Sequence, residues 1–138
     1  MADLTITAAE VRAVLYDRTT QRTAPAGEAI NAGQYCRLNT STGKFELGNA
    51  TTATEVGGVG FIAGRTVTTG EALTAYLAGS VVDVGDAIDG LNFDAPVYLS
   101  DTDGTLSTTA GTVSTVVGRV TCGWASTSAD KLLQLVKE

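Results

Sequence analysis

The sequence predicts an all-β domain, either a sandwich or a barrel of short strands. Turn-forming residues recur about every 8–12 residues, and the 3.6-residue period of helices is weak throughout. The 138 residues suit one compact domain, and a hydrophobic share of 43% is enough for a core. Aromatic residues make up only 6%, so we expect a core of Val, Ile, Leu and Ala. The few large side chains expected in it are Phe45, Phe61, Phe93 and Trp124.

The first 24 residues differ from the rest of the chain. The stretch LTIT, residues 4–7, alternates apolar and polar positions as a short strand does. The stretch TAAEVRAVLYDR, residues 7–18, fits a helix, because its first Thr and the Glu three residues later have the spacing of a capping box. Both alternatives stay open. A polar connector follows, so we divide the chain into an arm with its connector, residues 1–24, and a β domain, residues 25–138.

The stretch AGEAINAGQYCRLNTSTGKFEL, residues 26–47, predicts short strands joined by turns. Residues 28–30 and 34–38 flank Asn-Ala-Gly, a turn sequence, and residues 44–47 follow a polar loop with Gly43 at its tightest point. The next residues, GNATTATE, predict another loop.

The second half of the chain continues the pattern of strands and turns. VGGVGFIA, residues 56–63, is apolar and rich in Gly, which indicates a buried strand at close backbone approach. Pro96 opens the stretch PVYLS, where its missing N–H is harmless, and DTDG follows as a turn. The further strands are expected at residues 72–78, 81–84, 112–122 and 131–136.

The charge of the chain argues against a nucleic-acid partner. The net charge is −6 and the calculated pI is about 4.5, whereas a nucleic-acid surface needs clustered Lys and Arg. No basic residue lies between Arg65 and Arg119, although seven acidic residues do. Two interpretations remain: acidic side chains that keep the protein soluble, or an acidic outer face opposite a neutral attachment end.

The sequence predicts synthesis in a reducing cytosol and no membrane partner. The start MADLTITAAEV lacks the basic region and the apolar run of a signal peptide, and no stretch approaches the ~20 apolar residues of a membrane span. We therefore expect Cys36 and Cys122 to be free thiols. Each shares a strand face with apolar residues, so we expect both to be buried.

Several stretches resemble functional motifs without their essential parts. GGVGFIAG, residues 57–64, misses the spacing of a phosphate-binding loop, and no helix follows it. DTDG begins like a calcium loop, but the twelfth position is Thr112 rather than Glu. DVGDAID, residues 83–89, is expected to be a hydrated acidic loop, with weak cation binding as the alternative. The chain has no His to activate a nucleophile. We predict no enzyme, and no catalytic, cofactor or metal-binding residue.

Several stretches in order resemble a family of tailed-bacteriophage capsid decoration, or cement, proteins. The resemblance begins with LTITAAEV and AGEAINAGQYCRLNTSTGKFELGNA, and continues through VGGVGFIAG, APVYLSDTDGTLS and VVGRVTCGW. Each stretch alone is weak, but their order and spacing cover nearly the whole chain. The stretch EVRAVLYDRTTQRT is more charged than the family pattern, which leaves the conformation of residues 9–24 open.

The resemblance implies a small β-barrel or tulip-like domain on the outer surface of a virion. It implies a homotrimer at threefold and quasi-threefold sites, bound to the major capsid protein and stabilising the expanded head. We expect residues 1–15 to form the attachment arm, with a strand of the protein's own barrel or of a trimer partner as the alternative. The candidate capsid-binding residues are Leu4, Thr5, Ile6, Thr7, Val11 and Arg12.

A second function class is a small non-catalytic binding module. A carrier domain needs a lysine at the tip of an exposed hairpin, and Lys44 follows Gly43 at such a turn, although its neighbours lack the usual carrier motif. A carbohydrate-binding domain needs a platform of exposed aromatic side chains, for which one Trp and four Tyr are few.

Overall fold

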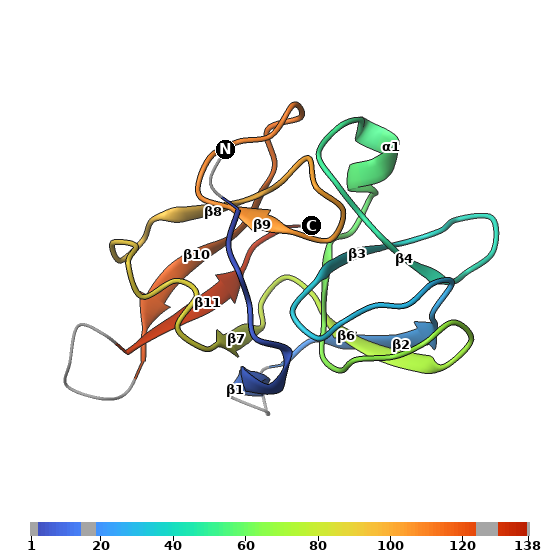
Figure 1. Cartoon of the computed structure of the whole chain (residues 1–138), viewed down its shortest axis with the longest axis horizontal. Coiled ribbons are helices and arrows are strands. Elements are labelled where there is room, and N and C mark those ends of the chain that lie inside the picture. The colour runs from blue at the N-terminus through green and yellow to red at the C-terminus, as the bar shows by residue number, and fades with distance from the viewer. Residues whose placement is uncertain (1–2, 15–18, 124–129, 138) are drawn as a thin grey trace.

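A computed structural model describes residues 3–14, 19–123 and 130–137. Nearly all of the regular structure is β, in two curled antiparallel sheets that together resemble a half-barrel (Figure 1). The helices among the described residues are a single 3₁₀ turn, η1 (Ala8–Glu10), and a four-residue helix, α1 (Ala53–Val56). The predicted all-β, barrel-like fold is confirmed.

The first sheet has six strands in the order β1-β7-β11-β10-β8-β9, and all of its pairs are antiparallel. A bulge between Val116 and Gly118 interrupts the pairing of β10 with β8. The strands are β1 (Val11–Val14), β7 (Val81–Val84), β8 (Pro96–Leu99), β9 (Leu106–Ser107), β10 (Val116–Cys122) and β11 (Lys131–Leu135).

The second sheet has five strands in the order β2-β6-β5-β3-β4, and the chain closes it immediately after β2. Ala26 forms a parallel bridge with Phe45, and Gly27 N–H donates to the Phe45 carbonyl at 2.7 Å. The two outer strands are thereby joined by a segment that continues directly from one of them. The strands are β2 (Gln21–Pro25), β3 (Tyr35–Leu38), β4 (Phe45–Leu47), β5 (Phe61–Ala63) and β6 (Ala72–Tyr76).

Two hydrophobic cores lie on opposite faces of the five-stranded sheet. On β5, Ile62 belongs to the larger core against the six-stranded sheet, whereas Phe61 and Ala63 belong to the smaller core inside the closed sheet. On β3, Tyr35 and Cys36 divide between the cores in the same way. Successive side chains of a strand point to opposite faces, so a strand with both faces buried reads as a continuous apolar run.

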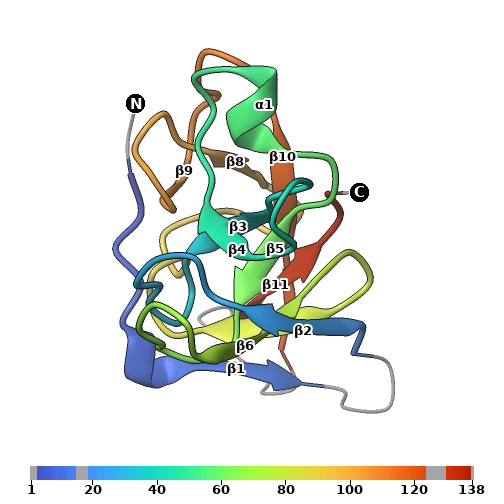
Figure 2. The same cartoon turned by 90° about the vertical axis from the view of Figure 1, so that its right-hand side faces the viewer.

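The N-terminal segment, residues 3–14, crosses the open side of the six-stranded sheet, and we refer to it as the strap. At its start, Asp3 bridges Ser107 and Leu4 N–H donates to the Leu106 carbonyl at 2.8 Å, beside β9. At its end, β1 pairs with β7. The strap therefore runs from one edge of the sheet to the other (Figures 1 and 2).

The boundary expected after residue 24 falls inside β2, and the described part of residues 1–24 supplies a strand to each sheet. Residues 4–7, expected as a short strand, form none, and the described part of residues 7–18 does not form the alternative helix. A single 3₁₀ turn, η1, is followed at once by the strand β1.

The predicted strand limits were most accurate where buried and less buried positions alternate regularly along the sequence. The strand over 81–84 is confirmed at both ends, and that from residue 96 is confirmed at its start. Residues 28–30 are not a strand, because Ile30 makes only an isolated bridge, with Val67. The expected strand over 56–63 is shortened to β5, and the strand from 112 begins at Val116. The loop over 48–55 contains the start of α1, where the Thr52 side chain caps the Glu55 amide.

Two expectations about the core were wrong. Phe93 is 45% exposed, and the Lys131 ammonium lies over its ring at 5.2 Å from the centroid. Cys122 is exposed, because β8 pairs only with the first part of β10, as far as Arg119, and does not extend beside the end of that strand. Trp124 lies outside the described residues. Tyr35, which was not expected in the core, is fully buried.

Candidate functional site

The six candidate capsid-binding residues all lie on the strap, and they divide between its two faces. Leu4, Ile6 and Val11 are half-buried and pack against the larger core of the same chain. Thr5, Thr7 and Arg12 are exposed. The structure therefore exposes the polar members of the candidate set and turns its apolar members inward.

Polar contacts hold both ends of the strap. Asp3 Oδ1 accepts a hydrogen bond from Ser100 Oγ at 2.7 Å, beside the Asp3–Ser107 bridge. At the other end, Arg12 pairs with Asp83 at 3.2 Å, but the Arg12 side chain is 71% exposed. An ion pair this exposed contributes little to stability, typically under about 1 kcal/mol.

The middle of the strap rests on a glycine. Gly33 has a φ of +90°, and a Cβ there would lie 2.7 Å from Ile6 Cγ2 and 3.0 Å from Val11 Cγ2. Gly33 is itself fixed, because its N–H donates to the Ala63 carbonyl at 2.9 Å. Only glycine combines this backbone conformation with such a close approach.

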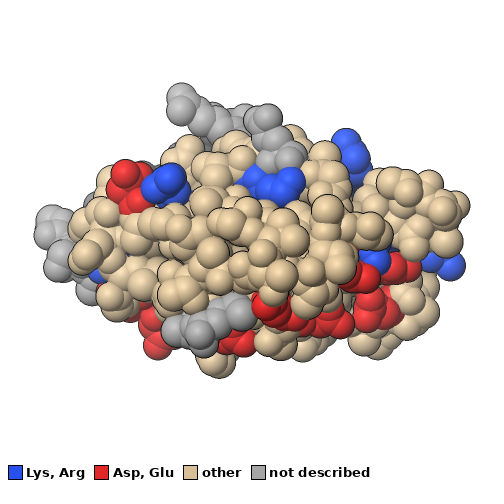
Figure 3. Space-filling model, turned by 90° about the horizontal axis from the view of Figure 1, so that it is seen from above, with Lys and Arg blue, Asp and Glu red and all other residues tan. Residues whose placement is uncertain are grey.

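Charge is unevenly distributed over the surface. Seen from above, many Asp and Glu side chains gather along one long side of the molecule, and several Lys and Arg lie towards the other side (Figure 3). Such an arrangement orients an approaching charged partner, and salt screens its effect over a distance of about 10 Å.

A polar groove of about 550 Å³ lies between the β3–β4 turn and α1. Arg37 and Asn39 line one side, Thr54 and Gly57 line the other, and none of the lining residues is aromatic. This groove was missed by the sequence analysis. Its only sequence signal is the Gly pair after α1, where a Cβ on Gly57 would meet the Arg37 side chain at 2.7 Å.

The Arg37 guanidinium that lines this groove lies beside two carboxylates from outside its lining, those of Glu46 and Glu55. Arg37 Nη2 lies 3.2 Å from Glu46 Oε1 and 3.7 Å from Glu55 Oε2. The Arg37 Nε is buried and has no hydrogen-bond partner among the described residues. Two carboxylates beside one guanidinium leave an excess of negative charge, which disfavours an anionic ligand.

Three aspartates of the acidic loops accept hydrogen bonds from the same chain. Asp101 accepts from the Thr112 amide at 2.9 Å and from its hydroxyl at 2.8 Å. Asp103 accepts from the Asn49 side chain, and Asp83 accepts from the Gly85 amide. No group of three or more Cys, Asp or Glu residues suited to a metal ion occurs in residues 3–14, 19–123 and 130–137.

The two thiols have different environments. Cys36 is fully buried, and burial raises the pKa of its thiol well above the ordinary value, so it stays protonated. Cys122 is exposed at the end of β10. Burial likewise raises the pKa of the neighbouring Tyr35 hydroxyl, which donates to the Val56 carbonyl at 2.7 Å.

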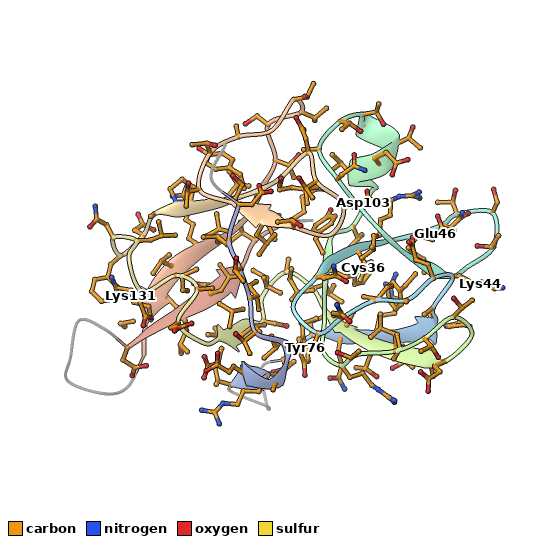
Figure 4. The ribbon with its side chains drawn as sticks, viewed as in Figure 1. Cys36, Lys44, Glu46, Tyr76, Asp103 and Lys131 are labelled. Atoms are coloured by element: carbon orange, nitrogen blue, oxygen red, sulfur yellow. The ribbon has the colours of Figure 1, made fainter. Side chains whose placement is uncertain are left out.

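The two lysines labelled in Figure 4, Lys131 and Lys44, have different surroundings. Lys131 Nζ donates to the carbonyls of Asp89 and Leu91 and thereby holds the loop before β8. Lys44 is exposed at the β3–β4 turn, on the outer side of the five-stranded sheet.

No protein-family model matches the chain, and a search of curated proteins finds no match either. In the part of the chain that the structure describes, no helix is long and apolar enough to cross a membrane.

Proposed function

We propose that the chain is a structural virion protein that binds the outer surface of a tailed-phage capsid and stabilises the expanded head. Its partner is the major capsid protein, and it binds as a trimer at threefold and quasi-threefold sites. The observation that carries the proposal is the ordered series of short stretches, from residue 4 to residue 124, that resembles the decoration family.

The positions of these stretches in the fold support the proposal. AGEAINAGQYCRLNTSTGKFEL contains the segment that closes the five-stranded sheet together with β3 and β4, and APVYLSDTDGTLS contains β8, its turn and β9. The resemblance therefore lies in the framework of the domain. A cement protein needs such a framework and a contact surface, and it needs no reaction chemistry.

We assign the contact to the outer face of the strap, where Thr5, Thr7 and Arg12 are exposed. An edge strand such as β1 also presents backbone donors and acceptors to a neighbouring chain. Leu4, Ile6 and Val11 then act indirectly, by holding this face in place against the larger core.

The test is cosedimentation with expanded heads assembled from the capsid protein of the same genome. The triple variant T5A/T7A/R12A is expected to keep the wild-type melting temperature and to lose at least tenfold in apparent affinity. The control is R65A/T69A, which removes one exposed Arg and one exposed Thr hydroxyl from the loop between β5 and β6, outside residues 3–14.

Deletion of residues 1–14 separates attachment from folding. If the strap mainly serves attachment, the remaining chain keeps its circular dichroism spectrum while binding falls sharply. Retained folding with full binding contradicts the assignment to the strap. Absence of binding by the intact chain, to heads before and after expansion, contradicts the proposed function itself.

The oligomeric part of the proposal has its own measurement. Electron microscopy of decorated heads is expected to show three copies around each threefold position, because a ring of three matches that symmetry. A stable dimer, both on heads and in solution, contradicts this part.

A small-ligand binding module is the second candidate, and the groove beside Arg37 is the observation in its favour. The hydroxyl and amide side chains there suit a neutral polyol or sugar, although the absence of an aromatic lining residue weakens the case. Chemical-shift changes of Arg37 and Thr54 on titration with a panel of neutral oligosaccharides would support this function, and unchanged spectra would remove it.

A further inference from the structure

The strap occupies a site built from three separate parts of its own chain. Leu106 and Ser107 of β9 receive its first residues, Gly33 receives its middle, and β7 receives β1. We call these three parts the strap site. They are all distant in sequence from the strap itself.

The strap site recognises a specific sequence in a specific register. Arg12 stands opposite Asp83, with opposite charges, and Ala13 stands opposite the fully buried Val82. Gly33 leaves room for Ile6, whereas any side chain at that position would collide with it. The occupant that satisfies all of these contacts is the sequence of residues 3–14.

The strap is also peripheral to the rest of the fold. Among its residues only Ala13 is fully buried, and the others are half-buried or exposed. β1 is also the outermost strand of the six-stranded sheet, beside β7. The strap can therefore leave β7 without separating any other pair of strands.

We propose that the strap exchanges between copies of this chain, so that residues 3–14 of one copy fill the strap site of a second copy. The contacts are the same in both arrangements, because the second copy offers the same β9 edge, the same Gly33 and the same β7 edge. Exchange of an identical element between copies is a low-cost route to an oligomer. This inference concerns contacts between copies and does not depend on capsid binding.

A disulfide between engineered cysteines on β1 and β7 shows whether a strap fills the strap site of its own copy or of another copy. Arg12 and Asp83 are direct Cα partners, and antiparallel partners lie within the range that a disulfide spans. The variant R12C/D83C also carries C122S, which removes the exposed native thiol. The Arg12 side of the replaced ion pair is exposed, so losing the pair costs little, and D83C also removes the hydrogen bond that Asp83 accepts from the Gly85 amide.

Light and ¹⁵N-labelled copies of this variant are mixed in reduced form, incubated at increasing concentration and oxidised rapidly. Mass spectrometry then identifies the peptide pairs that a disulfide joins between positions 12 and 83. If straps exchange, some disulfides should join one light and one heavy peptide. The fraction of such mixed pairs among all pairs should rise with concentration towards about half, the value for random pairing. Uniform pairs at every concentration would overturn the proposal.

The control introduces an equivalent cysteine pair between two strands of the five-stranded sheet. Thr23 and Thr74 are Cα partners on β2 and β6, and their hydroxyl oxygens lie 2.8 Å apart. The variant T23C/T74C/C122S is expected to give only uniform pairs. Equal mixing in both variants would show that whole chains unfold and reassemble, which overturns a specific exchange of the strap.

Discussion

The two sheets of this molecule are closed in different ways. The five-stranded sheet is closed by Ala26 and Gly27, which continue directly from β2 and reach Phe45. The six-stranded sheet is spanned by the strap, which begins beside β9 and ends as β1 beside β7. Ala26 is fully buried, whereas most of the strap is half-buried or exposed.

This difference shows that a segment can close a sheet without contributing equally to the stability of the fold. Ala26 belongs to the smaller core, so opening the five-stranded sheet would expose that core to water. The strap covers the larger core with three half-buried side chains, Leu4, Ile6 and Val11, and Ala13 is its one fully buried residue. The predictions below measure the two closures against each other.

The largest expected effect is at Phe45, where the five-stranded sheet closes. Its side chain is fully buried, and its ring meets Phe61 edge to face at a centroid distance of 5.0 Å. Phe45→Ala should lower the free energy of unfolding by about 3–5 kcal/mol, through lost burial and a cavity. Ile6→Ala should lower it by only about 1–2 kcal/mol, because its side chain is half-buried. Urea denaturation measures both values, and equal losses would contradict the difference between the closures.

The next effect is at Gly33, which supports the strap. Gly33→Ala should reduce the free energy of unfolding by about 2–3 kcal/mol, because the backbone strain of a positive φ adds to the collision with Ile6 and Val11. Gly43→Ala is the control, since Gly43 also has a positive φ, +72°, but no atom lies within 4 Å of its Cβ position. Hydrogen exchange at the Leu4 amide should accelerate in Gly33→Ala only. Equal exchange in the two variants would mean that Gly33 does not hold the strap.

The thiols should react in two separate steps. In the native protein a soluble disulfide reagent should label Cys122 rapidly, because it is exposed, while Cys36 stays unlabelled. Burial raises the pKa of the Cys36 thiol, so the reactive thiolate is scarce as well as inaccessible. Unfolding in denaturant should release the second thiol. Rapid labelling of both thiols without denaturant would contradict the burial of Cys36 in the smaller core.

The smallest expected effect on stability is at the turn of residues 68–71, where the Glu71 carbonyl accepts a hydrogen bond from the Ala26 amide. Glu71 accepts hydrogen bonds from the Thr68 amide at 2.7 Å and from the Thr68 hydroxyl at 2.9 Å, and these lower the pKa of its carboxyl. A lowered folded-state pKa stabilises the protein above the unfolded-state pKa, and this contribution is lost as pH falls through the folded-state value. Melting temperature measured between about pH 6 and 3 should therefore fall slightly more for the wild type than for Glu71→Gln. Identical profiles would show that the hydrogen bonds of the Glu71 carboxylate add nothing to stability.

Local patterns in the sequence were enough to predict most of the strands. Val81–Val84 alternates half-buried and fully buried positions, and Pro96 begins a strand where it needs no donor. The pattern failed at Cys122, because its exposure depends on where the neighbouring strand β8 ends. That length is a property of the assembled sheet and leaves no mark on the residues around Cys122.

The candidate site was predicted only in part. Alternation correctly placed Leu4 and Ile6 on one side of the segment and Thr5 and Thr7 on the other. The sequence does not say which side faces the protein's own core, because β9, β7 and Gly33 are brought to the strap by tertiary structure. The groove beside Arg37 was missed for the same reason, since its two walls are separated in sequence by β4.

The two faces of β5 have a consequence for how the molecule unfolds. Phe61 lies in the smaller core and its chain neighbour Ile62 lies in the larger one. Shifting the strand by one residue would place each side chain in the other core, where the packing partners differ. Neither core can rearrange alone, because one short strand fixes the position of both. Heating should therefore produce a single cooperative transition, with equal calorimetric and van't Hoff enthalpies, in spite of the two separate cores.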